Sequence, residues 1–391
     1  IPHNRNYFNM TKKRYKVSLS KEEAERLIGR VNDNGLYRFD DKSKSDAIRV
    51  ERDKLRNKTV FEEYCESSGI DQDSISAYWD KSDKFSILVR PQSVSDDINY
   101  DYIKEAVKDI NFKVKPPTTT IQSDEVLRII ITDIHVGMET DSKGYGLYPK
   151  VWNRDELFKC SERILKEVSK YKQQFKEVHV IDLGDMMDGW NGTTTRGGHN
   201  LPQNMSNRDA FKVGVKFKVE LYNQLQHLTG CKVKAYNVCN DNHSSDFGYV
   251  VNETVKNICE LQNPNIEVTN FESFISHYVI GNHCFLLCHG KDELHMKFGF
   301  KVKLDAVIES KIRQYICYHK LNDYFITFEK GDSHQQLLDS TSSEYFDYHN
   351  YRALSPASSW VQHNFKLGTC GFTLMTIELQ EKAKNIKQIE I

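Results

Sequence analysis

The chain has 391 residues, enough for two domains, and its 39% hydrophobic content is enough to bury a substantial core. Its formal net charge of −1 gives no overall attraction to nucleic acid, and no run of about 18 apolar residues would span a membrane. Nine scattered cysteines without a CxxC pair indicate reduced thiols and favour a cytoplasmic protein over a disulfide-stapled secreted one.

Residues 1–112 are polar and contain no convincing catalytic cluster. Helices are predicted over residues 21–29, 44–69 and 71–79. A short strand is predicted over residues 84–92. The sequence therefore predicts a smaller, mainly helical N-terminal domain. A winged-helix-like arrangement and a plain helical subdomain that packs on an enzyme fit this pattern equally well.

Residues 113–125, "KVKPPTTTIQSDE", predict a linker, because two prolines and a threonine run do not continue a helix. Strands and helices then alternate: strands at 126–133, 177–185 and 231–241, helices at 154–175 and 208–228. Residues 266–290 predict a strand region with a hairpin. This alternation predicts an α/β catalytic domain with covered sheets over residues 126–391.

Side chains of the metal-ligand type follow the predicted strands. They are Asp133 and His135 after the first strand, Asp185 after the second, Asn242 and His243 after the third, and then His289, Asp332 and His334. Asp133 and His135 stand at i and i+2, which point to the same side of an extended chain. Gly184 lets the backbone turn tightly. Mixed carboxylate, imidazole and amide ligands suit Mn, Fe or Zn better than Ca. The set predicts a dinuclear metal site, and mere strand capping is the alternative.

The order DxH, GDxxD, NH, a later His and GxxH resembles the calcineurin-like metallophosphoesterase family over residues 126–391. The loop after "GDMMD" and the N-terminal extension resemble phage-encoded members of the DNA-repair exonuclease type. The family's fold is a four-layered α/β/β/α sandwich. The resemblance implies the following roles: one metal held by Asp133, His135 and His334, a bridging Asp185, a second metal held by Asn242 and His289, and a catalytic His243.

Two positions depart from the family pattern. Asp241 stands where a Gly usually precedes the Asn-His pair, and a strained turn, an outer hydrogen bond or a charge that tunes the metals could each accommodate it. Asp332 stands where a histidine ligand of the second metal is usual. A carboxylate can ligate the same ion and would favour Mn. The alternative is that Asp332 lies outside the ligand set and leaves the second site weak.

The resemblance implies hydrolysis with two divalent metal ions, Mn favoured and Fe or Zn as alternatives, by attack of a metal-bridging hydroxide with His243 assisting. Asp188 is placed to orient nearby groups, with a capping role as the alternative. Residues 189–200 predict a flexible loop beside the metals, in which Arg196 and His199 are candidate substrate contacts. An ordinary solvated loop is the alternative.

The leading hypothesis for the substrate is nucleic acid, with DNA favoured, in the cytoplasm, which is the host's if the protein is phage-encoded. A basic run in the extension could contact phosphates or could form a solvated helix face: Arg49, Arg52, Lys54, Arg56 and Lys58. The alternatives are a nucleotide or cyclic-nucleotide phosphodiesterase, a protein phosphatase, and a degenerate binding protein without activity. The sequence does not indicate an oligomeric state.

A second Asn-His pair, Asn282-His283 in "IGNHCF", is the better literal match to the family's GNH motif. Two apolar runs flank Gly281 and Asn282, however, which predicts a tight hairpin turn. At about 3.3 Å per residue, the tip of this hairpin lies roughly 20 Å from the strand end that bears His289. The sequence therefore favours the earlier pair as part of the site.

Overall fold

The structure is a computed structural model. It describes residues 15–39, 41–53, 78–81, 86–89, 123–140, 150–172, 174–290, 296, 302–358, 361–362 and 369–391. The chain divides into two compact units, Ile1–Asp97 and Ile98–Ile391, and each is described by itself. The predicted linker at 113–125 lies outside the described residues up to residue 122, so the predicted domain boundaries stay predictions.

The first unit combines helices with short strands. Strands β1 (Tyr15–Ser18) and β2 (Leu36–Phe39) pair antiparallel, with α1 (Lys21–Ile28) between them in the chain. Helix α1 ends as predicted, because Gly29 adopts a left-handed φ of 64°. A second helix covers residues 42–53. A small core joins these elements: Val17, Leu19, Ala24, Tyr37, Phe39 and Ile48.

A further pair of strands, β3 (Tyr78–Lys81) and β4 (Ser86–Val89), forms an antiparallel ladder. Strand β4 confirms the strand predicted over residues 84–92. The helix predicted over 71–79 is wrong at its C-terminal end, which belongs to β3, and its first part lies outside the described residues. Of the helix region predicted over 44–69, residues 54–69 also lie outside the described residues. Strands of four residues are too short for the alternation of polar and apolar residues to reveal them, so the helical description missed β1 to β3.

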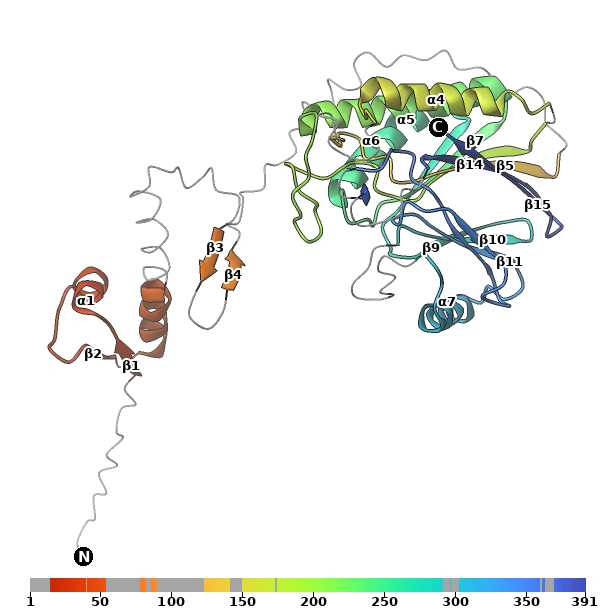
Figure 1. The fold of residues 1–391 in the computed structure, drawn as a ribbon. Helices are drawn as coiled ribbons and strands as arrows, with labels where there is room; N and C mark the ends of the chain where they lie inside the picture. Colours follow the sequence, from red (N-terminus) through yellow and green to blue (C-terminus); the bar gives the residue numbers. More distant parts are fainter. Residues whose placement is uncertain are drawn as a thin grey trace, which may run out of the picture. The chain divides into compact units, whose positions relative to one another are not determined.

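The second unit is a mixed α/β structure with two larger sheets (Figure 1). The six-stranded sheet has the order β15-β14-β5-β6-β7-β8. Its strands are β5 (Glu125–Ile131), β6 (Glu177–Asp182), β7 (Lys232–Val238), β8 (Ile266–Phe271), β14 (Gly371–Glu378) and β15 (Lys384–Glu390). The five-stranded sheet has the order β12-β13-β11-β10-β9. Its strands are β9 (Ser276–Ile280), β10 (His283–Cys288), β11 (Phe325–Lys330), β12 (Leu337–Asp339) and β13 (Asp347–Asn350).

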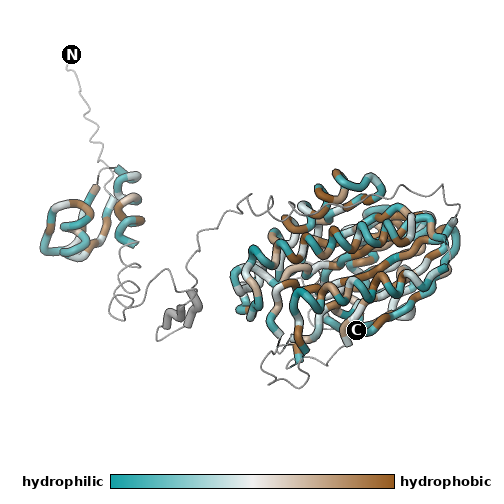
Figure 2. Tube along the Cα trace, turned by 90° about the horizontal axis from the view of Figure 1, so that it is seen from above, coloured by the Kyte–Doolittle hydropathy of each residue, from teal (hydrophilic) through white to brown (hydrophobic). Residues whose placement is uncertain are grey.

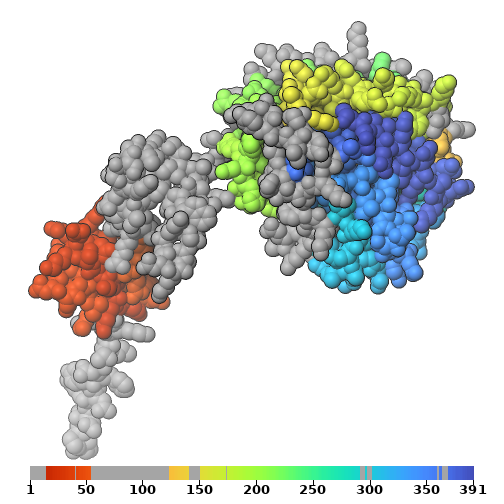
Figure 3. Space-filling view, in the orientation of Figure 1, coloured from red at the N-terminus to blue at the C-terminus, as the bar shows by residue number. Residues whose placement is uncertain are grey.

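Helices cover the outer face of each sheet. Those on the six-stranded sheet are α4 (Arg154–Val168), α5 (Asn207–Thr229) and α6 (Asp246–Gln262), and α7 (Ala306–Tyr318) packs on the five-stranded sheet. Figure 2 shows hydrophilic and hydrophobic residues alternating along the helices, as amphipathic helices require. In the space-filling view, α4 (yellow) lies at the surface beside the C-terminal strands (blue) (Figure 3). Among the described residues no helix is both long and apolar enough to cross a membrane.

The alternation of side chains along the strands separates the cores. On β5, Leu127 and Ile129 pack with the helices, whereas Val126 and Ile130 pack between the two sheets. Arg128, also on the inner face, donates to both carboxylate oxygens of Glu329 on β11 at 2.8 and 2.6 Å, with both side chains buried. This bidentate pair fixes β5 against β11, the strands that lead into two loops of the candidate site.

Candidate metal centre

The candidate site lies where strands of both sheets end. Strands β5, β6 and β7 are parallel neighbours, so their carboxyl ends meet at one edge of the six-stranded sheet. Strands β10 and β11 are parallel neighbours in the other sheet. The loops after these five strands carry the predicted residues, and they meet because the two sheets pack face to face. The predicted strand–helix alternation therefore accounts for how distant parts of the chain reach one place.

Three groups of side chains in the described residues offer ligand atoms that lie within 4.8 Å of one another. They are Asp133 with His135 and His334, Asp133 with Asp185 and His289, and His135 with Asp188 and His243. His334 Nε2 lies 3.2 Å from Asp133 Oδ1, and His289 Nε2 lies 3.1 Å from Asp185 Oδ2. Shared members make the groups one continuous cluster.

The backbone of these loops differs from the expectation. The i and i+2 placement of Asp133 and His135 was explained by an extended chain, but their φ values are 51° and 49°. Asp185, Asp332 and His334 also have positive φ, at 50°, 65° and 52°. Left-handed backbone at non-glycine residues costs about 1–3 kcal/mol each and persists only where the surroundings impose it. Five of the predicted ligands thus converge through strained turns after the strands end.

Two remaining candidates have buried oxygens that lack a hydrogen-bond partner among the described residues. They are Oδ1 of Asn242 and Oδ2 of Asp332. Asp332 Oδ1 lies 3.9 Å from His289 Nε2, so this carboxylate stands at the cluster and not away from it. Buried oxygens without donors are costly unless a cation or water binds them.

His289 shows most clearly that the donor set suits a cation. Its Nδ1 donates to the carbonyl of Leu183 at 2.9 Å, which leaves Nε2 with a lone pair in the neutral imidazole. That lone pair faces the Asp185 carboxylate at 3.1 Å, so a proton or a metal ion must lie between them. A carbonyl that fixes the imidazole tautomer in this way is typical of metal-ligating histidines. The residues present therefore fit a divalent metal.

The pKa values of the cluster are shifted because carboxylates and imidazoles lie close together. Burial alone would raise the pKa of Asp185, but His289 and His243 outweigh it and hold that pKa well below its ordinary value. Burial likewise opposes the charged form of His243, but Asp185 and Asp188 raise its pKa to about 10. A bound metal takes the place of such protons on its ligands.

Asp188 lies between two imidazoles. Its Oδ1 is 3.2 Å from His135 Nδ1 and 3.5 Å from His243 Nδ1. A carboxylate at Nδ1 leaves Nε2 of His135 to face His334, whose Nε2 is 3.4 Å away. This placement fits the orienting role that the sequence suggested for Asp188.

Asp241 organises the loop that bears the Asn-His pair. Its buried carboxylate accepts the backbone N–H groups of Ser244 at 2.7 Å and Ser245 at 2.8 Å, and that of Asp185 at 3.2 Å. Of the three possibilities for this position, the structure shows the hydrogen bonds, and the left-handed residue of the turn is Ser245, with φ 39°. Burial, with the nearby Asp185 carboxylate, raises the pKa of Asp241 to about 6.

Two glycines permit the close approach of loops. A Cβ on Gly184, which has φ 103°, would lie 2.8 Å from Nδ1 of His289. A Cβ on Gly331 would lie 2.0 Å from the hydroxyl of Thr132. The sequence indicated a turn at Gly184 but not its contact with the histidine, and it gave no role to Gly331 or Thr132. The Thr132 hydroxyl donates to Asp133 Oδ2 at 2.6 Å, which leaves Oδ1 to face His334.

The loop 189–200 lies against the Asn-His loop. The N–H of Thr195 donates to the carbonyl of His243 at 3.0 Å, and that of Arg196 donates to the carbonyl of Asn242 at 3.1 Å. The guanidinium of Arg196 donates to Asn240 Oδ1 at 2.8 Å, and this contact places it next to the cluster. His199 lies against Gly197 of its own loop and is absent from the ligand groups found among the described residues.

The second Asn-His pair has a structural role. Gly281 and Asn282 form the turn between β9 and β10, as predicted. His283 Nε2 lies 2.9 and 2.8 Å from the carbonyls of Glu378 and Glu381, so it ties the hairpin to the β14–β15 turn.

No protein-family model and no curated protein matches this sequence. Among solved structures, Vps29 from Entamoeba histolytica in complex with zinc is similar at 11% identity and a TM-score of 0.31, with 68% of this chain and 98% of that chain covered. A predicted phosphoesterase from Streptococcus pneumoniae is similar at 9% identity and a TM-score of 0.27, with 68% of this chain and 98% of that chain covered. A putative 5′-nucleotidase from Staphylococcus aureus is similar at 10% identity and a TM-score of 0.31, with 68% of this chain and 53% of that chain covered. TM-scores this low do not establish a shared fold.

Proposed function

We propose that this chain is a dinuclear-metal-dependent phosphoesterase with the α/β/β/α sandwich of the calcineurin-like family, and that it hydrolyses phosphodiester bonds in nucleic acid. The observation that supports this most is the convergence of ligand-type side chains from five strand ends, with His289 fixed by a carbonyl so that Nε2 faces a carboxylate. In this proposal Asp185 would be a ligand of both metals. The other ligands would be Asp133, His135 and His334 for one metal and Asn242, His289 and Asp332 for the second.

Two divalent ions, with Mn favoured over Fe or Zn, would supply charge neutralisation of the phosphoryl group and an ionised water when bound. His243 supplies the proton for the leaving oxygen. Its side chain is 20% exposed, whereas those of Asp185 and Asp188 are 2% exposed, so the imidazole is the part of this group that a substrate reaches. Asp188, whose Oδ1 lies 3.5 Å from His243 Nδ1, favours the protonated imidazole.

Arg196 is the candidate for binding a substrate phosphate. It lies in the loop that is hydrogen-bonded to the Asn-His loop, and its hydrogen bond to Asn240 places the guanidinium beside the metal ligands of that loop. His199, turned toward Gly197, is a weaker candidate for the same role.

The decisive experiment measures metal content and hydrolysis together. The full chain, loaded with Mn, is expected to hold two ions and to cleave a small aryl phosphodiester and single-stranded DNA. Asp185→Asn should abolish both activities and lower metal content, whereas Asp323→Asn, at an exposed position, should leave them unchanged. If no phosphoester in a panel of DNA, RNA, cyclic nucleotides and phosphopeptide is hydrolysed in Mn, the proposal is wrong.

Removal of the N-terminal unit tests whether nucleic acid is the substrate. Arg49 and Arg52 donate to the carbonyls of Lys16 and Ser18, so these two arginines also hold the helix at 42–53 to β1. The other basic residues of that run lie outside the described residues. Removal of residues 1–97 should reduce hydrolysis of DNA and spare the aryl phosphodiester. Equal loss of both activities would point to a role in folding instead.

A further inference from the structure

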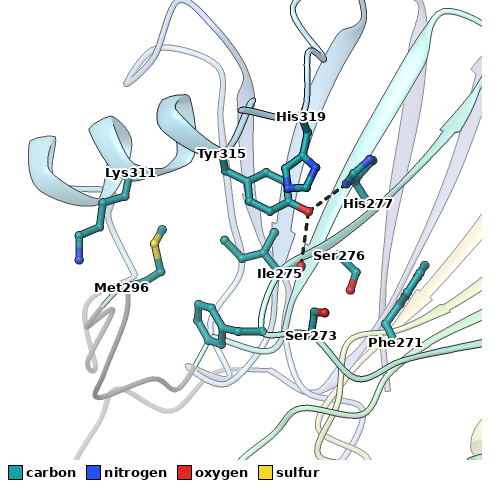
Figure 4. Close-up of a pocket in the computed structure, with 10 residues that line it drawn as sticks. Phe271, Ser273, Ile275, Ser276, His277, Met296, Lys311, Tyr315 and His319 are labelled. Atoms are coloured by element: carbon teal, nitrogen blue, oxygen red, sulfur yellow. Dashed lines mark hydrogen bonds between the residues drawn. The ribbon is translucent and has the colours of Figure 1, made fainter. Parts of the chain in front are cut away.

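A hollow of about 570 Å³ lies between the start of β9 and helix α7 (Figure 4). Its volume falls within the range of about 300–1,000 Å³ that is typical of small-molecule sites. Apolar surface comes from Phe271 at the end of β8 and from Phe274 and Ile275 in the segment that joins β8 to β9. Tyr315 and Lys311 come from α7. None of the groups in the metal cluster lines this hollow.

One wall of the hollow carries hydrogen-bonding groups. His277 Nδ1 lies 2.9 Å from the hydroxyl of Tyr315, whose oxygen is also 3.4 Å from the carbonyl of Ile275 (Figure 4). The His319 ring packs against both, with centroids 5.0 Å from His277 and 4.2 Å from Tyr315. Burial and the nearby His319 lower the pKa of His277, which favours the neutral imidazole. Because Nδ1 contacts the Tyr315 hydroxyl, Nε2 is the ring nitrogen that can meet a ligand.

The remaining lining suits a flat ring that bears a negative group. Figure 4 shows Lys311 on the other side of the hollow from His277, with Met296 close to it. A hydrocarbon chain would offer no hydrogen bond to Nε2 of His277, the ring nitrogen that does not contact Tyr315. A nucleobase has an apolar face for the aromatic and aliphatic side chains and a polar edge for the imidazole. The ammonium group of Lys311 can then pair with a phosphate.

The hollow lies at the same end of the five-stranded sheet as the candidate metal centre. Ser276, which lines it, pairs with Leu287 of β10, two residues before His289. Strand spacing places the Cα atoms of Ser276 and His289 about 8 Å apart. On the other side, Asn240 Nδ2 donates to the carbonyl of Glu272 at 2.9 Å while Asn240 Oδ1 accepts from Arg196. The lining segment is thus continuous with the loops of the site.

We propose that this hollow binds one nucleotide unit, with the base against Phe274, Ile275 and Tyr315, its polar edge at His277 and its phosphate at Lys311. This deepens the proposed function, because a single strand cleaved at the metal centre would place a flanking nucleotide here. The same chemistry would also be met by a free mononucleotide, and the experiment distinguishes the two sources.

The test is direct binding to the full chain, with adenosine 5′-monophosphate and with a short labelled oligodeoxythymidylate as probes. His277→Ala and Lys311→Ala should each weaken binding by about fivefold to tenfold, the loss expected for one hydrogen bond or ion pair. Gln314→Ala and Lys303→Ala, at exposed positions of the same region, are the matched controls and should bind as the unchanged chain does. Tyr315→Phe keeps the ring and removes only the hydroxyl, so it provides a reading if His277→Ala fails to fold.

The same titrations are repeated in the Asp185→Asn background, where the proposed hydrolysis is lost. An equal loss of binding on changing His277 in both backgrounds supports the hollow whether or not the chain is a phosphoesterase. Binding of the mononucleotide by itself identifies a free nucleotide as ligand, and binding of the oligonucleotide alone identifies a single strand. Unchanged affinity in the His277, Lys311 and Tyr315 variants, or no binding of either probe, overturns the proposal.

Discussion

Lys218 of α5 and Asp182 at the end of β6 form an ion pair at 2.5 Å in which neither side chain is exposed. The same ammonium group contacts amide oxygens of Asn237 on β7 and Asn252 on α6, at 2.9 and 2.5 Å. Asp182 in turn accepts the N–H of Gly184 at 3.0 Å. One buried cation therefore holds the turn before Asp185 to the elements that flank the Asn-His loop.

We expect Lys218→Met to lower the free energy of unfolding by about 3–5 kcal/mol, because it leaves the Asp182 carboxylate buried without an opposite charge. Metal affinity should fall as well, since the turn at Gly184 loses its anchor. Urea denaturation and metal titration measure the two effects. Lys216→Met removes an exposed lysine paired with Glu220 on the same helix and should change stability by less than about 1 kcal/mol. A similarly small change in Lys218→Met would contradict the argument.

Asp332→Ala tests whether the carboxylate replaces the usual histidine at the second metal. Its Oδ2 is buried and lacks a hydrogen-bond partner among the described residues, and its Oδ1 lies 3.9 Å from His289. We expect the variant to retain one ion tightly and to bind the second at least tenfold more weakly, the loss that follows removal of a metal-orienting group. Elemental analysis after dialysis counts the ions. Two tightly held metals per chain after the change would exclude Asp332 as a ligand.

The two Asn-His pairs give a matched comparison. His243→Ala should reduce kcat by about 10²- to 10⁴-fold with both metals retained, because it removes the proton donor and not a ligand. His283→Ala should leave kcat unchanged and lower the free energy of unfolding instead, because His283 contacts the carbonyls of Glu378 and Glu381. Steady-state kinetics and thermal unfolding separate the outcomes. The assignment fails if His283→Ala proves the more damaging change to kcat.

Much of the site could be predicted because it depends on order along the chain. Parallel strands separated by helices bring their ends together, so polar residues after β5, β6 and β7 were expected to meet. What the sequence could not show is how the loops turn. Asp133 and His135 use left-handed backbone, which is uncommon for residues other than glycine and has no pattern of its own in a sequence.

The sequence also could not show which residues from distant segments form hydrogen bonds and ion pairs with one another. The family pattern marked Asp241 as a departure, but only the fold shows its carboxylate accepting from Ser244, Ser245 and Asp185. Lys218 did leave a signal, because a lysine in an otherwise apolar stripe of α5 is unusual for a buried face. The position of its partner Asp182 depends on the pairing of β6 with β7, and no local sequence pattern indicates that pairing.

Two buried histidines, His179 on β6 and His349 on β13, should make the folded chain less stable in mild acid. Burial lowers the pKa of each to about 4, from an ordinary value of 6.5 in the unfolded chain. Between pH 6.5 and about 4 the unfolded chain binds a proton at each position and the folded chain does not. The free energy of unfolding should therefore fall by about 1.4 kcal/mol per pH unit for each histidine. Above this window the two histidines add nothing to the pH dependence.

Urea denaturation at a series of pH values between 7 and about 4 measures this slope. His179→Gln should reduce the slope by the share of one histidine, about 1.4 kcal/mol per pH unit, whatever the variant does to stability at pH 7. His227→Gln, at an exposed position of α5, is the matched control and should leave the slope as it is. An unchanged slope in His179→Gln would mean that His179 takes up its proton in the folded chain as readily as in the unfolded one.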